Sequence, residues 1–384
     1  MKRELERVDI PGEHDARERA WAVISAAHAA REPTRPDHRR RLAPAVAVAI
    51  VAAVVSAAVS PPGQALFRSI RETVGVEHAQ TALFAVPGGG RLLVRSTEGV
   101  WVVDADGSRR RLGRYAQASW SPHGLYVAAT RRNALYALTP RGEERWSLAR
   151  PGVRSPHWTG SRTDTRIAYT SGNELRVVGG DGRGDTTLAT ASDMRLALLA
   201  WRPGPRRQLA YALPEQHVVR VVDAGVRGDV RWSVRVTGRV RDLEWSSDGQ
   251  LLLVTARTPA ADTIALYRPG RRTAVTVVRK PPGVVAAALR PGTHQIAVLE
   301  RPGEVASVEL AGRTIFSTAG DLRGLTWSPD GRRLLVGWPE ADQWLFVEVR
   351  GRRPGRIHAV ANVSSQFSAE LRASAFPVVE GWSP

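Results

Sequence analysis

The amino-acid sequence predicts an all-β protein: a seven-bladed β-propeller preceded by a single transmembrane helix and a short helical cytoplasmic tail. Three observations lead to this prediction. A motif built on one tryptophan recurs through most of the 384 residues, an uncharged apolar run occupies residues 42–60, and arginines gather just before that run. We divide the chain into a tail at 1–41, the membrane helix at 42–60, a linker helix at 61–80 and the propeller at 81–384.

The repeated motif has three parts. A tryptophan ends one short strand, a turn of Pro, Ser, Asp and Gly follows, and an apolar run makes the next strand. Clear copies are ASWSPHGLYVAAT from Ala118, LEWSSDGQLLLVTA from Leu243 and LTWSPDGRRLLVGW from Leu325. The seven anchor positions are spaced about 35 to 44 residues apart, which is the range of a four-stranded propeller blade; they are Ala85, Trp120, Trp158, Trp201, Trp245, Leu289 and Trp327.

The W-S-P-D-G turn with its following apolar strand resembles the TolB-like family of bacterial propeller repeats, which are related to WD repeats. The resemblance covers roughly residues 81 to 360 and implies the fold, with no particular function. One blade cannot bury both faces of its sheet, so we expect the tryptophans to pack between blades. The chain ends in FPVVEGWSP, which repeats the first strand of a blade. Pairing of this strand with the first blade would close the ring, and the sequence leaves the pairing strand open.

The apolar run at 42–60 reads LAPAVAVAIVAAVVSAAVS, which is long enough to cross the hydrocarbon core as a helix. A buried core helix usually carries a polar stripe, and this run has none. A cleavable signal peptide is the other alternative, because small residues surround Ser56. However, about forty residues precede the run and two prolines follow it, so we expect an uncleaved anchor in the lipid bilayer.

The charges beside this run predict its orientation. Four arginines lie between residues 35 and 41, whereas the arginines that follow the run are balanced by glutamates. Positive residues beside a span tend to remain in the cytoplasm. We therefore expect a single-pass protein of the cell membrane, with its N-terminus in the cytoplasm and its C-terminal domain outside.

The cytoplasmic tail contains one short amphipathic helix in ARERAWAVISAAHAA, where Trp21, Ile24 and His28 share one side. A helix this short is marginal alone, so we expect it to rest on the membrane surface or on another protein. The layout of tail, span and outer domain resembles that of membrane-bound anti-sigma factors, which implies that Trp21, Ile24 and His28 bind a cytoplasmic regulator. The zinc-binding type of that family needs cysteine, and this chain has none.

The composition and the missing motifs argue against most chemistry. Without cysteine there is no disulfide, no thiolate nucleophile and no lipidated cysteine. The charge of +18 is almost all arginine at turn-like positions, so we expect solvated loop charge and no nucleic-acid partner. G-x-S-x-G, P-loop and H-E-x-x-H motifs are absent from the sequence, so we expect no enzyme activity and no cofactor.

Two groups of side chains contain residue types that can bind metal ions. The run Asp104 to Gly107 resembles part of a calcium loop but sits where a hairpin turn is due. The histidines of the repeats lack ligand spacing, so we expect exposed turn residues and no metal site; they are His123, His157, His217, His294 and His358.

These observations leave three hypotheses for function. The first is a membrane-anchored extracytoplasmic propeller that acts as a binding or scaffold module for a protein, peptide or cell-envelope ligand. The second is a transmembrane signalling protein whose outer propeller controls what the cytoplasmic helix holds. The third is a propeller enzyme, which would need acidic or histidine side chains that converge at one mouth of the ring. We rank the enzyme last.

Overall fold

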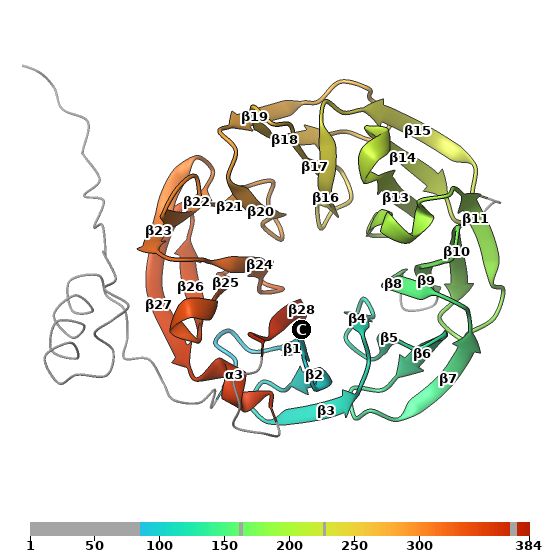
Figure 1. Ribbon diagram of the computed structural model, residues 1–384, viewed down its shortest axis with the longest axis horizontal. Helices are drawn as coiled ribbons and strands as arrows, with labels where there is room; N and C mark the ends of the chain where they lie inside the picture. Colours follow the sequence, from blue (N-terminus) through green and yellow to red (C-terminus); the bar gives the residue numbers. More distant parts are fainter. Residues whose placement is uncertain (1–84, 161–163, 226–227, 369–374) are drawn as a thin grey trace, which may run out of the picture. The chain divides into compact units, whose positions relative to one another are not determined.

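The computed structural model describes residues 85–160, 164–225, 228–368 and 375–384, which form a ring of seven four-stranded antiparallel sheets (Figure 1). The prediction of an all-β, seven-bladed propeller is confirmed. The predicted tail, transmembrane helix and linker helix, at 1–41, 42–60 and 61–80, lie outside the described residues. Within the described part, every helix is too short or too polar to span a bilayer.

Each blade runs from an inner strand at the ring centre to an outer strand at the rim (Figure 1). The first blade contains β28 (Val378–Ser383), β1 (Arg91–Ser96), β2 (Gly99–Val103) and β3 (Arg109–Gly113). The second contains β4 (Gln117–Trp120), β5 (Val127–Arg131), β6 (Ala134–Leu138) and β7 (Glu144–Ala149). The third contains β8 (Val153–Gly160), β9 (Thr165–Ser171), β10 (Glu174–Gly179) and β11 (Thr186–Thr190).

The remaining blades follow in chain order. The fourth contains β12 (Leu198–Trp201), β13 (Gln208–Leu213), β14 (Val218–Asp223) and β15 (Val230–Arg235). The fifth contains β16 (Arg239–Trp245), β17 (Leu252–Arg257), β18 (Asp262–Tyr267) and β19 (Thr276–Lys280). The sixth contains β20 (Val284–Leu289), β21 (Ile296–Glu300), β22 (Val305–Leu310) and β23 (Arg313–Ala319). The seventh contains β24 (Arg323–Trp327), β25 (Arg333–Trp338), β26 (Gln343–Arg350) and β27 (Arg353–Ala361). Short helical turns join some strands; they are η2 (Met194–Leu196), η3 (Pro214–Gln216), η4 (Pro339–Ala341) and α3 (Val363–Gln366).

The strand sequences reflect the position of each strand in its blade. The second strand β5 reads VAATR and is buried along most of its length, because a blade lies against each of its faces. The outer strand β7 reads ERWSLA and alternates exposed with half-buried residues. The hydrophobic core is accordingly divided into seven clusters, each formed where two adjacent blades meet.

Six of the seven predicted anchor residues pack between blades, as predicted. Trp158, Trp201, Trp245 and Trp327 are buried in clusters that join adjacent blades, and Leu289 takes the same place where tryptophan is absent. Trp120 is partly buried against the cluster between the first and second blades.

The repeated Ser-x-Asp-Gly sequence is a turn that its own side chains close. In the fifth blade the Ser246 hydroxyl donates to Asp248 at 2.6 Å and accepts from the backbone N–H of Leu251 at 2.9 Å. Gly249 has a φ of +66°, and a side chain there would meet the carbonyl of Pro203 at 3.1 Å. The turn therefore needs glycine at this position.

Three arginines repeat one contact between a blade and the next. Each donates to the carbonyl of the turn glycine of the following blade and lies over the tryptophan of that blade, which adds a cation–π attraction. Arg91 contacts Gly124 at 2.7 Å and Trp120 at 5.2 Å, Arg202 contacts Gly249 at 2.7 Å and Trp245 at 5.3 Å, and Arg290 contacts Gly331 at 2.6 Å and Trp327 at 5.5 Å.

The C-terminal strand closes the ring. β28 pairs with β1, and Trp382 lies opposite Leu92 just as Trp327 lies opposite Leu334. The prediction of Ala85 as the first anchor is wrong, because Ala85 is an exposed residue in a bend outside the strands. The first repeat is split between the two ends of the propeller, so its tryptophan comes last in the chain. The Trp382 indole donates to the Gly89 carbonyl at 3.0 Å and joins the two parts.

Candidate functional site

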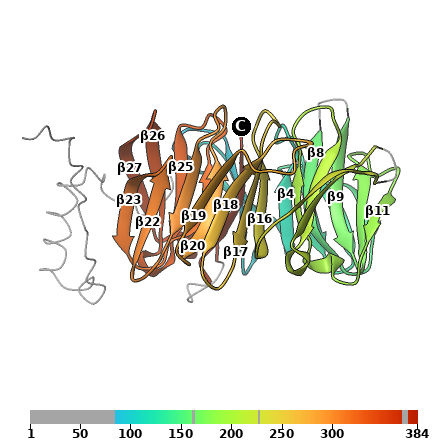
Figure 2. The same cartoon turned by 90° about the horizontal axis from the view of Figure 1, so that it is seen from above.

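The ring has two faces, and the repeated turns occupy only one of them. The β4–β5, β16–β17 and β24–β25 turns carry the Ser-x-Asp-Gly pattern or its variants, and we call their face the signature face. The other face holds the connections between the second and third strands of each blade and those from one blade to the next. We call it the mouth face; the β5–β6 and β7–β8 connections belong to it. Figure 2 shows the strands running between the two faces.

Five of the seven inner strands have an irregular register in the half that approaches the mouth face; these are β8, β16, β20, β24 and β28. In β8 the irregularity falls at Ser155 and Pro156, and Ser155 has a φ of +50°, which is uncommon for a residue other than glycine. Bulges of this kind re-aim side chains and are frequent beside binding sites.

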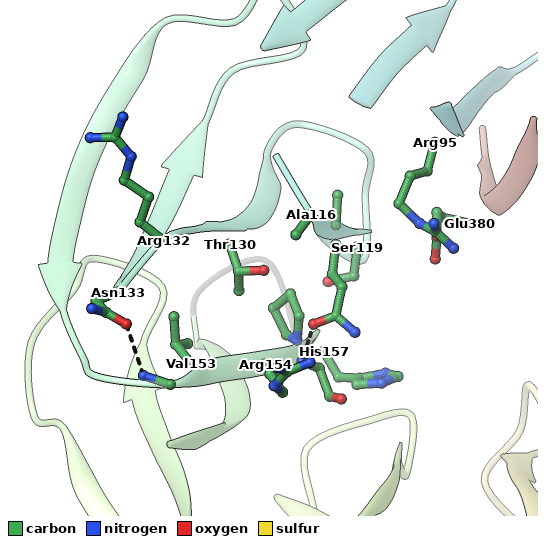
Figure 3. Close-up of a pocket in the computed structure, with 15 residues that line it drawn as sticks. Arg95, Ala116, Ser119, Thr130, Arg132, Asn133, Val153, Arg154, His157 and Glu380 are labelled. Atoms are coloured by element: carbon green, nitrogen blue, oxygen red, sulfur yellow. Dashed lines mark hydrogen bonds and ion pairs between the residues drawn. The ribbon is translucent and has the colours of Figure 1, made fainter. Parts of the chain in front are cut away.

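A pocket of about 610 Å³ opens on the mouth face between the first three blades. Figure 3 shows Arg95 and Glu380 on one side, Arg132 and Asn133 on the other, and His157 on the strand between them. The lining comes from β1, β28, β4, the β5–β6 connection and the bulged part of β8. Three blades thus contribute to one site.

Two amide side chains fix the pocket wall. The Gln117 Oε1 atom accepts from the backbone N–H of Ser155 at 2.8 Å, and the Asn133 Oδ1 atom accepts from the backbone N–H of Gly152 at 3.1 Å (Figure 3). These bonds tie the bulge and the β7–β8 connection of the third blade to the second blade. They also set the orientation of both amides, because the oxygen of each is already engaged.

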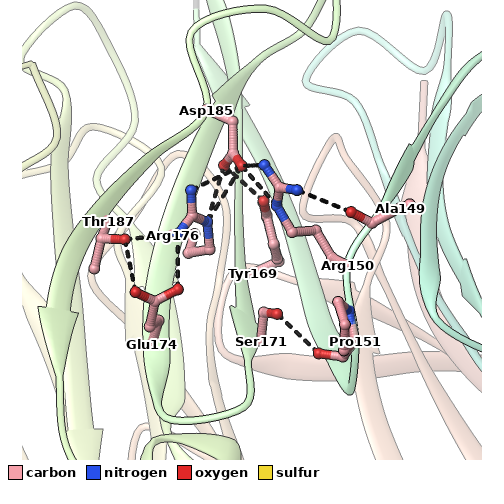
Figure 4. A network of polar contacts seen from close by, with 9 residues as sticks. All are labelled: Ala149, Arg150, Pro151, Tyr169, Ser171, Glu174, Arg176, Asp185 and Thr187. Carbon is pink, nitrogen blue, oxygen red and sulfur yellow. Dashed lines mark hydrogen bonds and ion pairs between the residues drawn. The ribbon is translucent and has the colours of Figure 1, made fainter.

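A polar network centred on Asp185 holds Arg150, which lies in the β7–β8 connection just before the pocket wall (Figure 4). Asp185 accepts from Arg150 Nε at 2.7 Å, from Arg176 Nη2 at 2.9 Å and from the Tyr169 hydroxyl at 2.6 Å. Burial acts to raise the pKa of Asp185, but these three donors outweigh it and hold that pKa below its usual value. Arg150 directly precedes the pocket wall, so the network anchors the wall to the third blade.

Only some of the charged side chains in the pocket have an ion-pair partner. Arg95 forms an ion pair with Glu380. Arg132 and Arg154 are exposed, and neither has an ion-pair partner among the described residues. Burial lowers the pKa of His157 to about 4, so its imidazole is neutral at physiological pH. The pocket therefore has a surplus of positive charge.

A smaller pocket of about 150 Å³ occupies the equivalent place between the fifth and sixth blades. Its buried Asp262 is fully engaged: it accepts from Arg257 Nε at 2.6 Å and from the backbone N–H groups of Gly283 and Val284 at 2.8 Å. Nearby on β16, Glu244 accepts from the backbone N–H of Leu289 at 2.8 Å, and burial raises its pKa to about 8. These groups join two blades, so the smaller pocket is mainly structural.

The residues singled out from the sequence have different outcomes. Trp21, Ile24 and His28 lie outside the described residues. The predicted hairpin turn at Asp104 to Gly107 is confirmed, since Gly107 N–H donates to the Asp104 carbonyl at 2.9 Å. Across the described ranges, no group of three or more acidic or histidine side chains is placed to hold a metal ion.

The expectation that the histidines are exposed turn residues fails for two of them, because His358 is a half-buried residue of β27 and His157 is a residue of β8. His157 lies within β8 and is desolvated at the pocket, whereas His294 is exposed and contacts Asp248 at 2.9 Å. A signal for this difference exists in the sequence. Pro156 directly precedes His157 inside a strand pattern, and proline in an inner strand indicates a bulge.

No family model matches the chain, and no curated protein sequence matches it. Solved structures do match. A chain of the Mitotic Checkpoint Complex crystal structure is 15% identical with a TM-score of 0.51, covering 64% of this chain and 78% of that chain. KlHsv2 with loop 6CD replaced by a Gly-Ser linker is 11% identical with a TM-score of 0.51, covering 70% of this chain and 93% of that chain. At these identities the likeness shows the fold alone, and the chain is a seven-bladed β-propeller protein.

Proposed function

We propose that this protein is a membrane-anchored extracytoplasmic binding module whose mouth face takes a protein, peptide or cell-envelope ligand. The pocket of about 610 Å³ between the first three blades carries the proposal. Its wall is held on both sides, by Gln117 and Asn133 of the second blade and by the Asp185 network of the third. A preformed concave site on a rigid scaffold is typical of ligand binding.

The polar groups of the pocket support binding without catalysis. Glu380 is engaged in an ion pair with Arg95. His157 is neutral, and among the described residues no carboxylate hydrogen-bonds its ring. A general acid–base pair needs two titratable groups within reach of the same reacting atom. The proposal therefore assigns no reaction to this site.

The location rests on the sequence before the propeller. The uncharged run at 42–60 and the arginines between residues 35 and 41 support a single span with the N-terminus in the cytoplasm. The W-S-P-D-G turns support a relationship to the TolB-like repeats of bacterial envelope proteins. With this topology the mouth pocket would meet ligands outside the cytoplasm.

Site-specific photo-crosslinking in intact cells tests the proposal. A photo-reactive residue is placed at Ala116, an exposed residue of the pocket, in the full chain. The control carries the same residue at Leu125, which is 60% exposed on the signature face of the same blade. We expect a defined adduct from Ala116 and none from Leu125. Equal adducts from both positions, or none from Ala116, would contradict the proposed binding face.

A further inference from the structure

We infer that the mouth pocket recognises an oxyanion, a carboxylate or phosphate group carried by its ligand. This inference rests on the proposed binding function and names the chemistry of the ligand. Its basis is that two arginines and two amide NH₂ groups line the pocket as donors without an acceptor among the described residues.

The amide orientations are the first observation. Gln117 and Asn133 each use the side-chain oxygen to accept a backbone N–H, from Ser155 and Gly152 respectively. With the oxygen turned toward the wall, each amide has its NH₂ group free, and an NH₂ group can donate but cannot accept. Both side chains thus offer donors that no hydrogen bond within the described residues uses.

The arginines are the second observation. Arg132 and Arg154 line the same pocket, are exposed, and have no ion-pair partner in the described part of the chain. A guanidinium donates and never accepts, and its fork matches the two oxygens of a carboxylate or phosphate. The one acidic residue of the lining, Glu380, does not oppose an anion strongly because Arg95 neutralises it.

The wall geometry is the third observation. The two amide donors are held by their bonds to the wall, which the bulge at Ser155 and the network around Asp185 support, so they need little reorganisation when a ligand binds. Preorganised amide donors beside two arginines distinguish this pocket from the scattered surface arginines of a chain whose net charge is +18. An oxyanion that bridges Arg154 and the two amides would satisfy donors from two blades at once.

The test measures binding of short fluorescent probes to the full chain in a zwitterionic detergent at physiological ionic strength. The probes are hexaglutamate, hexaglutamine and inorganic tripolyphosphate with a fluorescent label. We expect hexaglutamate or tripolyphosphate to bind at least about tenfold tighter than hexaglutamine, because a hydrogen bond to a charged group contributes more than a neutral one. The tighter of the two anionic probes identifies a carboxylate or a phosphate as the preferred group.

The decisive variant combines Gln117→Glu with Asn133→Asp. Each change keeps the oxygen that accepts from Ser155 or Gly152, so the wall is retained, but it replaces the donor NH₂ by an acceptor oxygen and a negative charge. We expect binding of the anionic probe to fall by about tenfold or more. Arg154→Gln should weaken it in the same direction.

The matched control combines Gln208→Glu with Gln295→Glu on the signature face. Each of these glutamines accepts from an arginine through its side-chain oxygen, Gln208 from Arg202 at 2.7 Å and Gln295 from Arg290 at 3.0 Å. The control therefore adds the same total charge on the other face of the ring, away from the pocket. We expect less than about twofold weakening, because distant surface charges are screened.

Two results would overturn the inference. The first is equal binding of hexaglutamine and both anionic probes; the second is equal weakening by the control and the pocket variant, which would show attraction by overall charge alone. Either result leaves the proposed function standing if the Ala116 crosslink forms, because the mouth would then bind a ligand of different chemistry.

Discussion

Replacement of Trp382 by alanine should open the ring at its closing strand. The indole packs edge-on against Phe346 of the seventh blade, with ring centroids 5.7 Å apart, and donates to the Gly89 carbonyl at 3.0 Å. It therefore links the C-terminal strand both to the neighbouring blade and to the beginning of the propeller. Among the described residues, no other anchor tryptophan donates a hydrogen bond to a segment so distant in the sequence.

The size of the effect follows from these contacts. Removal of a buried tryptophan side chain costs about 3 to 5 kcal/mol, and Trp382 is only half-buried, so we expect a loss of about 3 kcal/mol in the free energy of unfolding. Trp382→Phe keeps the aromatic packing and loses the hydrogen bond, which should cost about 1 kcal/mol. Val378→Ala, at a 45% exposed position of the same strand, should cost under about 0.5 kcal/mol.

Urea unfolding of the full chain measures these differences, with hydrogen exchange of the β1 backbone amides as a second readout. β1 pairs with β28 along its length, so weaker closure should speed exchange there before other strands are affected. Equal costs for Trp382→Ala and Val378→Ala, with unchanged β1 exchange, would refute the conclusion that β28 closes the ring.

Four further outcomes are expected. Asp262→Asn should cost about 2 kcal/mol at pH 7. Burial acts to raise the Asp262 pKa, but Arg257 and backbone donors hold it below its usual value, so the difference from wild type should shrink as pH falls toward 3 in chemical denaturation. Burial raises the pKa of Glu244 to about 8, so the folded protein favours the protonated carboxyl up to about that pH. The wild-type protein should therefore lose stability as pH rises from 5 to 9, and Glu244→Gln, which cannot ionise, should lose less in the same assay. Topology reporters at residue 40 and at the C-terminus should report inside and outside the cytoplasm respectively, and a C-terminus inside would contradict the anchor orientation. Trp21→Ala in the full chain should weaken pull-down of a cytoplasmic regulator, and a pull-down with no specific partner would count against the signalling hypothesis.

The fold could be predicted because its determinants are local. Trp245, Ser246, Asp248 and Gly249 lie within five residues, and together they specify the end of an inner strand and the turn that follows. The first blade was misassigned because its determinants are not local: Trp382 and Gly89 meet only when the two ends of the propeller come together.

The pocket could not be predicted for a related reason. Gln117 meets the backbone of Ser155, and Arg150 meets Asp185, between residues more than thirty positions apart on different blades. Neither pair forms a motif, and each side chain alone is an ordinary surface residue. The one signal that the sequence offers is the position of Pro156 inside a strand pattern, which is typical of a bulge.

The repeated sequence motif and the candidate site therefore lie on opposite faces of the ring. The Ser-x-Asp-Gly turns lie on the signature face, where repeated turns reverse the chain in the same way and three arginines make the same contact with the next blade. On the mouth face the inner strands bulge and the connections differ from blade to blade, so no repeat is visible there. The pocket of about 610 Å³ opens on this irregular face. In a propeller of this kind, we infer that the repeat pattern marks the face that maintains the ring, and that the positions which break it mark the face that binds.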